Sequence, residues 1–210
     1  MIEQGTPEWH AMRCGKVTAS RVADVMRSGR GGAPSASRAR YMGELVAERL
    51  TGTPYESFKS AEMQRGNDVE AEAVSAYAFI CGAQCDRIAF VDHPSIEMSG
   101  ASPDALIGND GLAEFKCPAS HTHIQTLLSD KIDGDYVRQM QWQMACTGRQ
   151  WCDFVSYDPR LPTEMALYVR RLQRDDAAIA AMEIAVSQFL FETSMMVDDL
   201  KAKYANEVAA

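Results

Sequence analysis

The feature that most constrains the fold of this chain is a change of sequence pattern near residue 86. Before it, apolar residues recur at helical spacing, in segments at about 38–50 and 60–80 that stop near Gly52 and Gly82. After it, short runs rich in β-branched and aromatic residues are separated by turn residues, a pattern typical of strands. We therefore expect an α+β chain in which a helical region precedes a meander of strands.

The remaining elements are expected at defined positions. Short helices should begin at Thr6-Pro7 and near Thr18 or Ser20, and the glycine-rich segment 28–37 should form a loop. Asn109-Asp110-Gly111 is a hairpin turn signal. Strands are expected at about 88–91, 97–101, 104–107, 112–117, 151–157 and 164–172, and helices at about 120–128, 136–146 and 175–204.

Length and composition are those of one globular domain. A chain of 210 residues with 46% hydrophobic side chains can bury a core without disulfides or structural zinc, so we expect its six cysteines to be free thiols. No apolar run approaches the roughly 20 residues that span a bilayer. The first residues have neither the basic nor the apolar part of a secretion signal, so we expect a cytoplasmic protein.

Charged residues converge on the predicted hairpin. Strand alternation places Glu114 and Lys116 on one face and Phe115 on the other, and Asp104 reaches the charged face from the preceding strand. Two carboxylates and an ammonium form a site for a hard divalent cation such as Mg²⁺, which would activate water against a phosphodiester. A cross-strand salt bridge on a solvated sheet face is the alternative, and the spacing alone does not decide between them.

Two helices offer further polar groups that point inward. Glu70 shares a helical face with Ala73 and Tyr77, where a carboxylate needs either a salt bridge or a cation. Gln139 and Gln143, four residues apart, share a face of a later helix. They would hold a metal-bound water or a phosphate, or else cap buried backbone groups.

The charge distribution is uneven. The net charge of −8 argues against a simple nucleic-acid binder, which would usually be basic. The first forty residues nevertheless hold many arginines, which would allow DNA to enter on one side. They are Arg13, Arg21, Arg27, Arg30, Arg38 and Arg40.

Several motifs occur in the order typical of one family. They are Gly66-x-x-x-Glu70, Ser102-Pro103-Asp104, Glu114-Phe115-Lys116-Cys117-Pro118, a Gln-x-Gln motif starting at Gln139, the opening run Glu3 to Arg13 with Thr18-Ala19-Ser20, and Tyr157-Asp158-Pro159-Arg160. Together they resemble the lambda-exonuclease (YqaJ-type viral recombinase) branch of the PD-(D/E)xK nucleases, over about residues 3–172. The resemblance implies a restriction-endonuclease-like core, in which helices flank a mixed central sheet.

The resemblance also implies an activity. Similar proteins are processive, Mg²⁺-dependent 5′→3′ double-strand DNA exonucleases that form a homotrimeric ring, release 5′-mononucleotides and leave 3′ single strands for an annealing protein. It implies two Mg²⁺ per site, replaceable by Mn²⁺, and a phage or prophage origin. In this chain, residues 1–58 would be a helical region contacting DNA and the 5′-phosphate, 59–172 the catalytic core and 173–210 the C-terminal helix of a single nuclease domain, 1–210.

The resemblance assigns roles to the metal site. Asp104, Glu114 and the backbone carbonyl of Phe115 would hold the first Mg²⁺, and Glu70 would help to hold a second. Lys116 would position or deprotonate the nucleophile.

Other roles concern the DNA. Gln139 would contact metal-bound water or phosphate, and the terminal 5′-phosphate would bind a pocket of Arg13, Ser20 and Ser102. Weaker assignments are a DNA contact by Arg27 or Arg30 in the 28–37 loop, a contact by Gln143, and Met63 as an apolar wedge at the end base pair, where a buried core methionine is an equal alternative.

Two other functions stay open from the sequence. The first is a structure- or sequence-specific DNA endonuclease on the same core. The second is a catalytically silent DNA-binding or assembly subunit, against which the intact set of Asp104, Glu114 and Lys116 argues.

Overall fold

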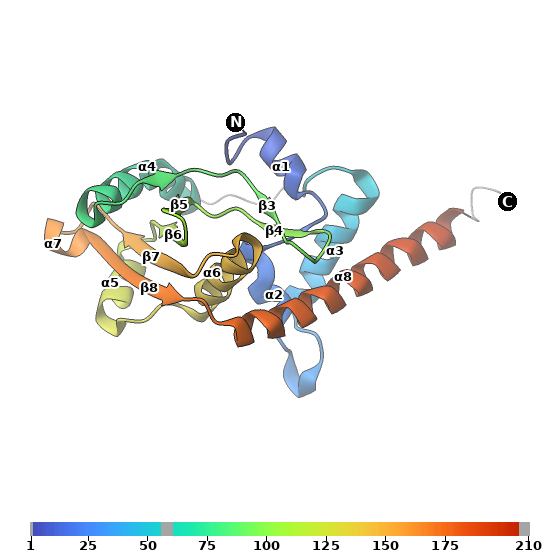
Figure 1. The fold of residues 1–210 in the computed structure, drawn as a ribbon. Coiled ribbons are helices and arrows are strands. Elements are labelled where there is room, and N and C mark those ends of the chain that lie inside the picture. The colour runs from blue at the N-terminus through green and yellow to red at the C-terminus, as the bar shows by residue number, and fades with distance from the viewer. Residues whose placement is uncertain (1, 56–60, 206–210) are drawn as a thin grey trace.

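A computed structural model describes residues 2–55 and 61–205, and a five-stranded mixed sheet forms its centre (Figure 1). The sheet order is β2-β5-β6-β7-β8. Its strands are β2 (Cys85–Asp86), β5 (Ala105–Ile107), β6 (Gly111–Lys116), β7 (Trp151–Tyr157) and β8 (Leu167–Gln173). The predicted hairpin is confirmed, because β5 and β6 pair antiparallel from Ile107 and Gly111 onward.

One pair in this sheet is parallel. β6 and β7 run side by side, with Glu114 opposite Phe154, while their other neighbours are antiparallel. Parallel strands need a long crossover, which here consists of α5 (Ser120–Ser129) and α6 (Gly134–Thr147). This mixed sheet with flanking helices is the architecture that the resemblance implied.

A second, three-stranded sheet joins the N-terminal region to the core. It consists of β1 (Val17–Thr18), β4 (Ser99–Ala101) and β3 (Val91–Asp92), with β1 parallel to β4. Thr18 lies opposite Gly100 in this pairing. The segment that follows α1 (Pro7–Arg13) is therefore held next to Ser102.

Helices pack on both faces of the central sheet. Ala73 and Tyr77 of α4 (Ala61–Cys81) pack with Phe115 on one face. Met140 and Met144 of α6 pack with Leu112, Cys152 and Phe154 on the other. Because side chains alternate along β6, its even-numbered residues face α6 and Phe115 faces α4.

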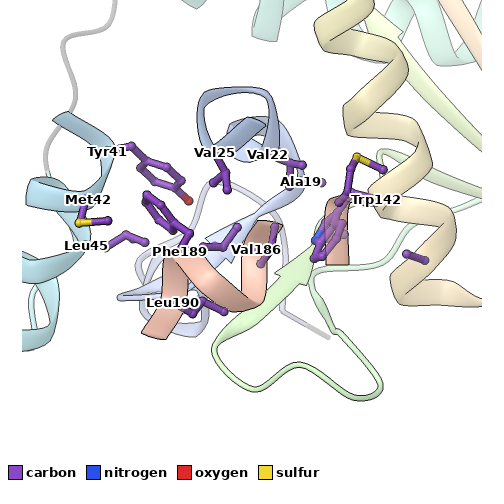
Figure 2. Close-up of a cluster of buried hydrophobic side chains, with 14 of the residues drawn as sticks. Ala19, Val22, Val25, Tyr41, Met42, Leu45, Trp142, Val186, Phe189 and Leu190 are labelled. Atoms are coloured by element: carbon purple, nitrogen blue, oxygen red, sulfur yellow. The ribbon is translucent and has the colours of Figure 1, made fainter. Parts of the chain in front are cut away.

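A separate helical core lies beside the sheet. The long α8 (Asp176–Ala205) packs on α2 (Val22–Met26) and α3 (Ala36–Thr51), and Phe189 stacks on Tyr41 with ring centroids 5.5 Å apart (Figure 2). The predicted helix ends are confirmed: the Thr6 side chain caps α1, and Gly52 ends α3 in the left-handed region at φ 67°. No helix in the described ranges is long and apolar enough to cross a membrane.

Three expected elements differ from those observed. The strand expected at 88–91 is reduced to Val91–Asp92. The carbonyls before it accept hydrogen bonds from side chains of the N-terminal segment and not from a neighbouring strand: Trp9 donates to Ala89 and Gln4 donates to Ile88. The loop expected at 28–37 contains a short 3₁₀ turn, η2 (Arg30–Gly32), and α3 already begins at Ala36. The strand expected at 164–172 starts later, after the short helix α7 (Thr163–Ala166).

Candidate active site

β6 places its three central residues as the sequence predicted. Glu114 is 1% exposed on the α6 face, whereas the Lys116 side chain is 23% exposed on the same face. Phe115 is buried on the opposite face and meets the Tyr77 ring edge-on at 5.6 Å. Because side chains alternate along β6, Phe115 packs in the core while Glu114 and Lys116 lie beside α6.

Three donors hold the Glu114 carboxylate. Gln139 donates from Nε2 to Oε1 at 2.6 Å, and Gln143 donates from Nε2 to Oε2 at 2.6 Å. The Lys116 ammonium lies 2.5 Å from Oε1. The predicted shared face of the two glutamines is confirmed. Gln143 is fully buried behind Glu114, however, so its position does not suit the DNA contact that the sequence suggested.

Two further carboxylates lie close to Glu114. Asp104 directly precedes β5, and its Oδ2 accepts from the Phe115 backbone N–H at 2.7 Å. Burial, followed by the charge of Glu114, raises the pKa of Asp104 well above its usual value. Burial also raises the pKa of Glu70 on α4, although the guanidinium of Arg87, 3.9 Å away, opposes the shift. The predicted trio of acids is therefore brought together.

Lys116 is the ammonium of this cluster. Its burial alone would lower its pKa, but the carboxylates of Glu114 and Asp104 outweigh burial and raise that pKa. The charged form therefore predominates at neutral pH. It can donate to an anionic group in the adjoining cavity.

A cavity of about 350 Å³ opens beside these groups. It is lined by Gly66, Glu70, Asp104, Phe115, Lys116, Cys117 and Tyr136. A second cavity of about 330 Å³ shares Glu70 and Asp104 and adds Gln4 and Arg87. The two carboxylates thus border both spaces.

Tyr136 is a residue of this site that sequence reasoning missed. The Lys116 ammonium lies 5.1 Å from the centre of its ring, which in turn stacks on Phe154 at 5.6 Å. The sequence showed only that Tyr136 comes three residues before Gln139 near the start of a helix. Tyr136 lies one helical turn before Gln139, and this spacing could have indicated that both side chains share a face of α6.

The donor set suits a hard cation. Carboxylate oxygens of Asp104, Glu114 and Glu70 and the Phe115 carbonyl are ligands that Mg²⁺ and Mn²⁺ prefer. Across residues 2–55 and 61–205, no three His, Cys, Asp or Glu side chains are grouped tightly enough to be a ready-made metal centre. The fit rests instead on the converging carboxylates, because a bound cation would offset the burial and like-charge repulsion that raise the pKa of Asp104.

A pocket lies on the N-terminal side of Asp104. Arg13 donates from Nη1 to Ser102 Oγ at 3.1 Å, and its guanidinium stacks 4.1 Å above the Trp9 ring. The Trp9 indole N–H donates to the same Ser102 oxygen at 2.9 Å. Burial lowers the pKa of Arg13. Its partner Ser102 is separated from Asp104 by one residue, so the pocket adjoins the cluster of carboxylates.

The third predicted member of this pocket joins through a hydroxyl. Thr18 Oγ1 lies 3.5 Å from Arg13 Nη2 and 3.5 Å from Ser20 Oγ. These groups line a cavity of about 510 Å³. The structure therefore brings Arg13, Ser20 and Ser102 together around Thr18 and Trp9, neither of which was predicted to belong to the pocket.

The weaker assignments are more scattered. Arg27 is exposed and lies 2.5 Å from Asp135 at the start of α6, and 3.6 Å from Asp24. Arg30 is exposed in η2. The side chain of Met63 lies outside the described residues, so its assignment as a wedge stays a prediction.

Comparisons with known proteins agree with this geometry. The profile of the YqaJ-like viral recombinase domain matches residues 8–150. Two crystal structures of LHK-Exo, an alkaline exonuclease from Laribacter hongkongensis, one of them in complex with dAMP, are 50% identical in sequence. Each has a TM-score of 0.90, and the match covers 96% of this chain and 99% of the other.

A more distant structure shows the fold alone. A phage-related exonuclease from Haemophilus somnus 129PT is 16% identical, with a TM-score of 0.71 over 88% of this chain and 96% of that one. No curated protein matched. The predicted α+β, restriction-endonuclease-like fold is confirmed.

Proposed function

The chain belongs to the YqaJ-like viral recombinase family, and on that premise we propose that it is a Mg²⁺-dependent 5′→3′ double-strand DNA exonuclease. One observation carries the proposal: Asp104, Glu114 and Lys116 converge at the end of β6, next to the Arg13–Ser102 pocket. The alkaline exonuclease that is 50% identical to this chain supports the assignment to a DNA-degrading enzyme.

Different residues of the site would bind the metal and position the nucleophile. Asp104, Glu114, the Phe115 carbonyl and Glu70 would hold Mg²⁺, or Mn²⁺ in its place. Bound Mg²⁺ supplies Lewis-acid polarisation of the scissile phosphodiester and makes water a better nucleophile. Lys116 would position the nucleophile and offset developing negative charge.

The two glutamines would have different tasks. Gln139 holds Glu114 and lies one turn from the cavity-lining Tyr136, so it would contact the scissile phosphate or its water. We assign Gln143 to the orientation of Glu114, because a fully buried amide that donates to Oε2 cannot also reach DNA.

The position of the pocket supports the proposed 5′→3′ direction of digestion. We assign the 5′-terminal phosphate to Arg13, Ser20 and Ser102, since an arginine and two hydroxyls suit a phosphate dianion. Ser102 is separated from Asp104 by one residue. A strand held there by its end would present its first phosphodiester to the carboxylates, so that each cut releases a 5′-mononucleotide and leaves a 3′ single strand.

The wider assembly belongs to the same proposal. We infer a processive homotrimeric ring that threads duplex DNA and passes the 3′ overhang to a single-strand annealing protein of phage or prophage recombination, within the cytoplasm of a bacterial host. Residues 1–58 would contact DNA through Arg27 or Arg30. Residues 59–172 would be the catalytic core, with Met63 as the apolar wedge, and 173–210 the C-terminal helix. Light scattering after size exclusion tests the ring, and a persistent monomer would refute it.

Digestion of linear duplex DNA, labelled separately at its 5′ and 3′ ends, tests the activity. With Mg²⁺ the 5′ label should appear first as a mononucleotide, and chelation of the metal should stop its release. Early release of the 3′ label would reverse the assigned polarity. Linearisation of closed circular DNA would favour an endonuclease on the same core, and an absence of digestion would favour a silent subunit.

A further inference from the structure

A cluster of two arginines lies at Pro118, which directly follows the cavity-lining Cys117. It is centred on Asp158, which follows β7 and has no exposed surface. Arg160 donates to both oxygens of this carboxylate, from Nε at 2.7 Å and from Nη2 at 2.9 Å. Arg65, on α4, donates to Oδ1 at 3.2 Å.

The cluster is fixed in place by several contacts. Ser120 Oγ donates to Asp158 Oδ2 at 2.6 Å, and the Pro118 carbonyl accepts from both arginines, at 3.3 Å from Arg65 and 3.4 Å from Arg160. Burial alone would raise the pKa of Asp158, but its donors from Arg160 and Ser120 outweigh burial and lower that pKa. The carboxylate is therefore charged at any pH at which the enzyme would work, and both guanidiniums are oriented in advance.

The arginine cluster adjoins two residues of the cavity wall, Gly66 and Cys117. Arg65 directly precedes Gly66, which lines the cavity with Glu70 and Lys116. Pro118, whose carbonyl accepts from both arginines, directly follows Cys117 in the same cavity wall. Each end of the cluster is therefore one residue away from the lining of the cavity.

Both arginine side chains are partly exposed. The Arg65 side chain is 29% exposed and that of Arg160 is 47% exposed. In a chain with a net charge of −8, cationic groups beside a carboxylate cavity would counter the repulsion between the protein and a nucleic-acid backbone. Planar guanidinium groups that are already oriented suit phosphate oxygens.

We propose that Arg65 and Arg160, held by Asp158, form a binding site for a DNA backbone phosphodiester beside the cleaved bond. This site rests on the proposed nuclease function and is separate from the 5′-phosphate pocket at Arg13. It binds a bridging phosphate, which every substrate carries, and not the terminal one. It therefore strengthens binding of DNA with either a 5′-phosphate or a 5′-hydroxyl end.

Salt-dependent DNA binding tests the site. The affinity of the full chain for a linear duplex is measured by fluorescence anisotropy without divalent metal, across a range of salt concentrations. Arg160→Gln should weaken binding about tenfold and reduce the slope of log Kd against log salt by about one. Arg65→Gln should do the same, whereas Arg65→Lys should keep the wild-type slope because it keeps the charge. With Mg²⁺, the glutamine variants should raise KM more than they lower kcat.

A matched control separates this role from a structural one. Arg170 on β8 is 45% exposed and ion-paired with Asp130 at 3.2 Å, and neither residue is adjacent in sequence to a residue that lines the cavity at Asp104. Arg170→Gln should leave the salt slope unchanged. The proposal would be overturned if the salt slopes of Arg65→Gln and Arg160→Gln were unchanged. It would also be overturned if Arg65→Lys and Arg65→Gln lost the same DNA affinity. The arginines would then serve only to hold Asp158 in the folded structure. A wild-type chain that neither binds nor digests DNA would instead overturn the proposed function.

Discussion

Replacement of Arg13 gives the sharpest test of the 5′-phosphate pocket. The Arg13 guanidinium is stacked on Trp9 and donates to Ser102, so it is already oriented before any ligand binds. A hydrogen bond to a charged group contributes about 1.5–3 kcal/mol. Loss of one such contact to a phosphate dianion corresponds to about a 10- to 150-fold change in an equilibrium or specificity constant.

The assay compares two substrates that differ only at the 5′ end. In wild-type protein, kcat/KM for a 5′-phosphorylated duplex should exceed that for a 5′-hydroxyl duplex. Arg13→Ala should reduce this ratio about 10- to 150-fold, because only the phosphorylated end loses the contact. Damage to the fold would affect both substrates and cancel in the ratio. Arg13→Lys should recover part of the ratio, since it keeps the charge but not the forked geometry.

Arg21 provides a matched control. It lines the same cavity but is bound to Glu44 at 2.9 Å and to Asp24 at 2.7 Å, and it stacks on Tyr41. Arg21→Ala should therefore leave the substrate ratio near its wild-type value. Equal losses on phosphorylated and hydroxyl ends in Arg13→Ala would refute the assignment of the pocket.

Three other predictions concern chemistry and stability. Lys116→Ala should abolish cleavage while DNA binding without metal persists, and near-normal turnover would remove Lys116 from the mechanism. Phe189→Ala, at a fully buried position, should lower the free energy of unfolding, measured in denaturant, by about 3–5 kcal/mol. Phe191→Ala, at a position 62% exposed on the same helix, should have little effect. Similar losses in the two variants would contradict the burial of Phe189 in the helical core. Burial lowers the pKa of His93 in the folded chain, although the carboxylate of Glu183 acts in the opposite direction. Below about pH 6.5, the ordinary histidine pKa, the unfolded chain therefore binds more protons than the folded chain, and the free energy of unfolding should fall as the pH drops. His93→Gln should reduce this pH slope, and an unchanged slope would assign it to other groups.

Local patterns in the sequence were enough to predict many elements and the orientation of several side chains. Alternation along β6 predicted that Phe115 and Glu114 lie on opposite faces, and spacing along α6 predicted that Gln139 and Gln143 lie on one face. The predicted caps at Thr6 and Gly52 were found as well. Each of these features depends on backbone geometry repeated over a few residues, so the sequence contains all of the necessary information.

Contacts between distant segments required the tertiary structure. Residue patterns alone did not place Arg13 beside Ser102, 89 residues later; only the family resemblance put the two in one pocket. Neither showed that Trp9 would share the same hydroxyl. Nor did it show that Gln143 would be buried behind Glu114 instead of facing DNA. Such contacts depend on how the helices pack against the two faces of the sheet, which periodicity within one element does not specify.

The metal site combines both kinds of information. Sequence spacing by itself determined that Glu114 and Lys116 share a face and left two possibilities, a salt bridge on a solvated sheet or a buried cation site. Only the tertiary structure decided the surroundings, because α4 brings Glu70 and α6 brings Gln139 to the end of the same strand. Burial then makes the converging carboxylates costly, since low polarity disfavours charge, and a bound cation would offset that cost.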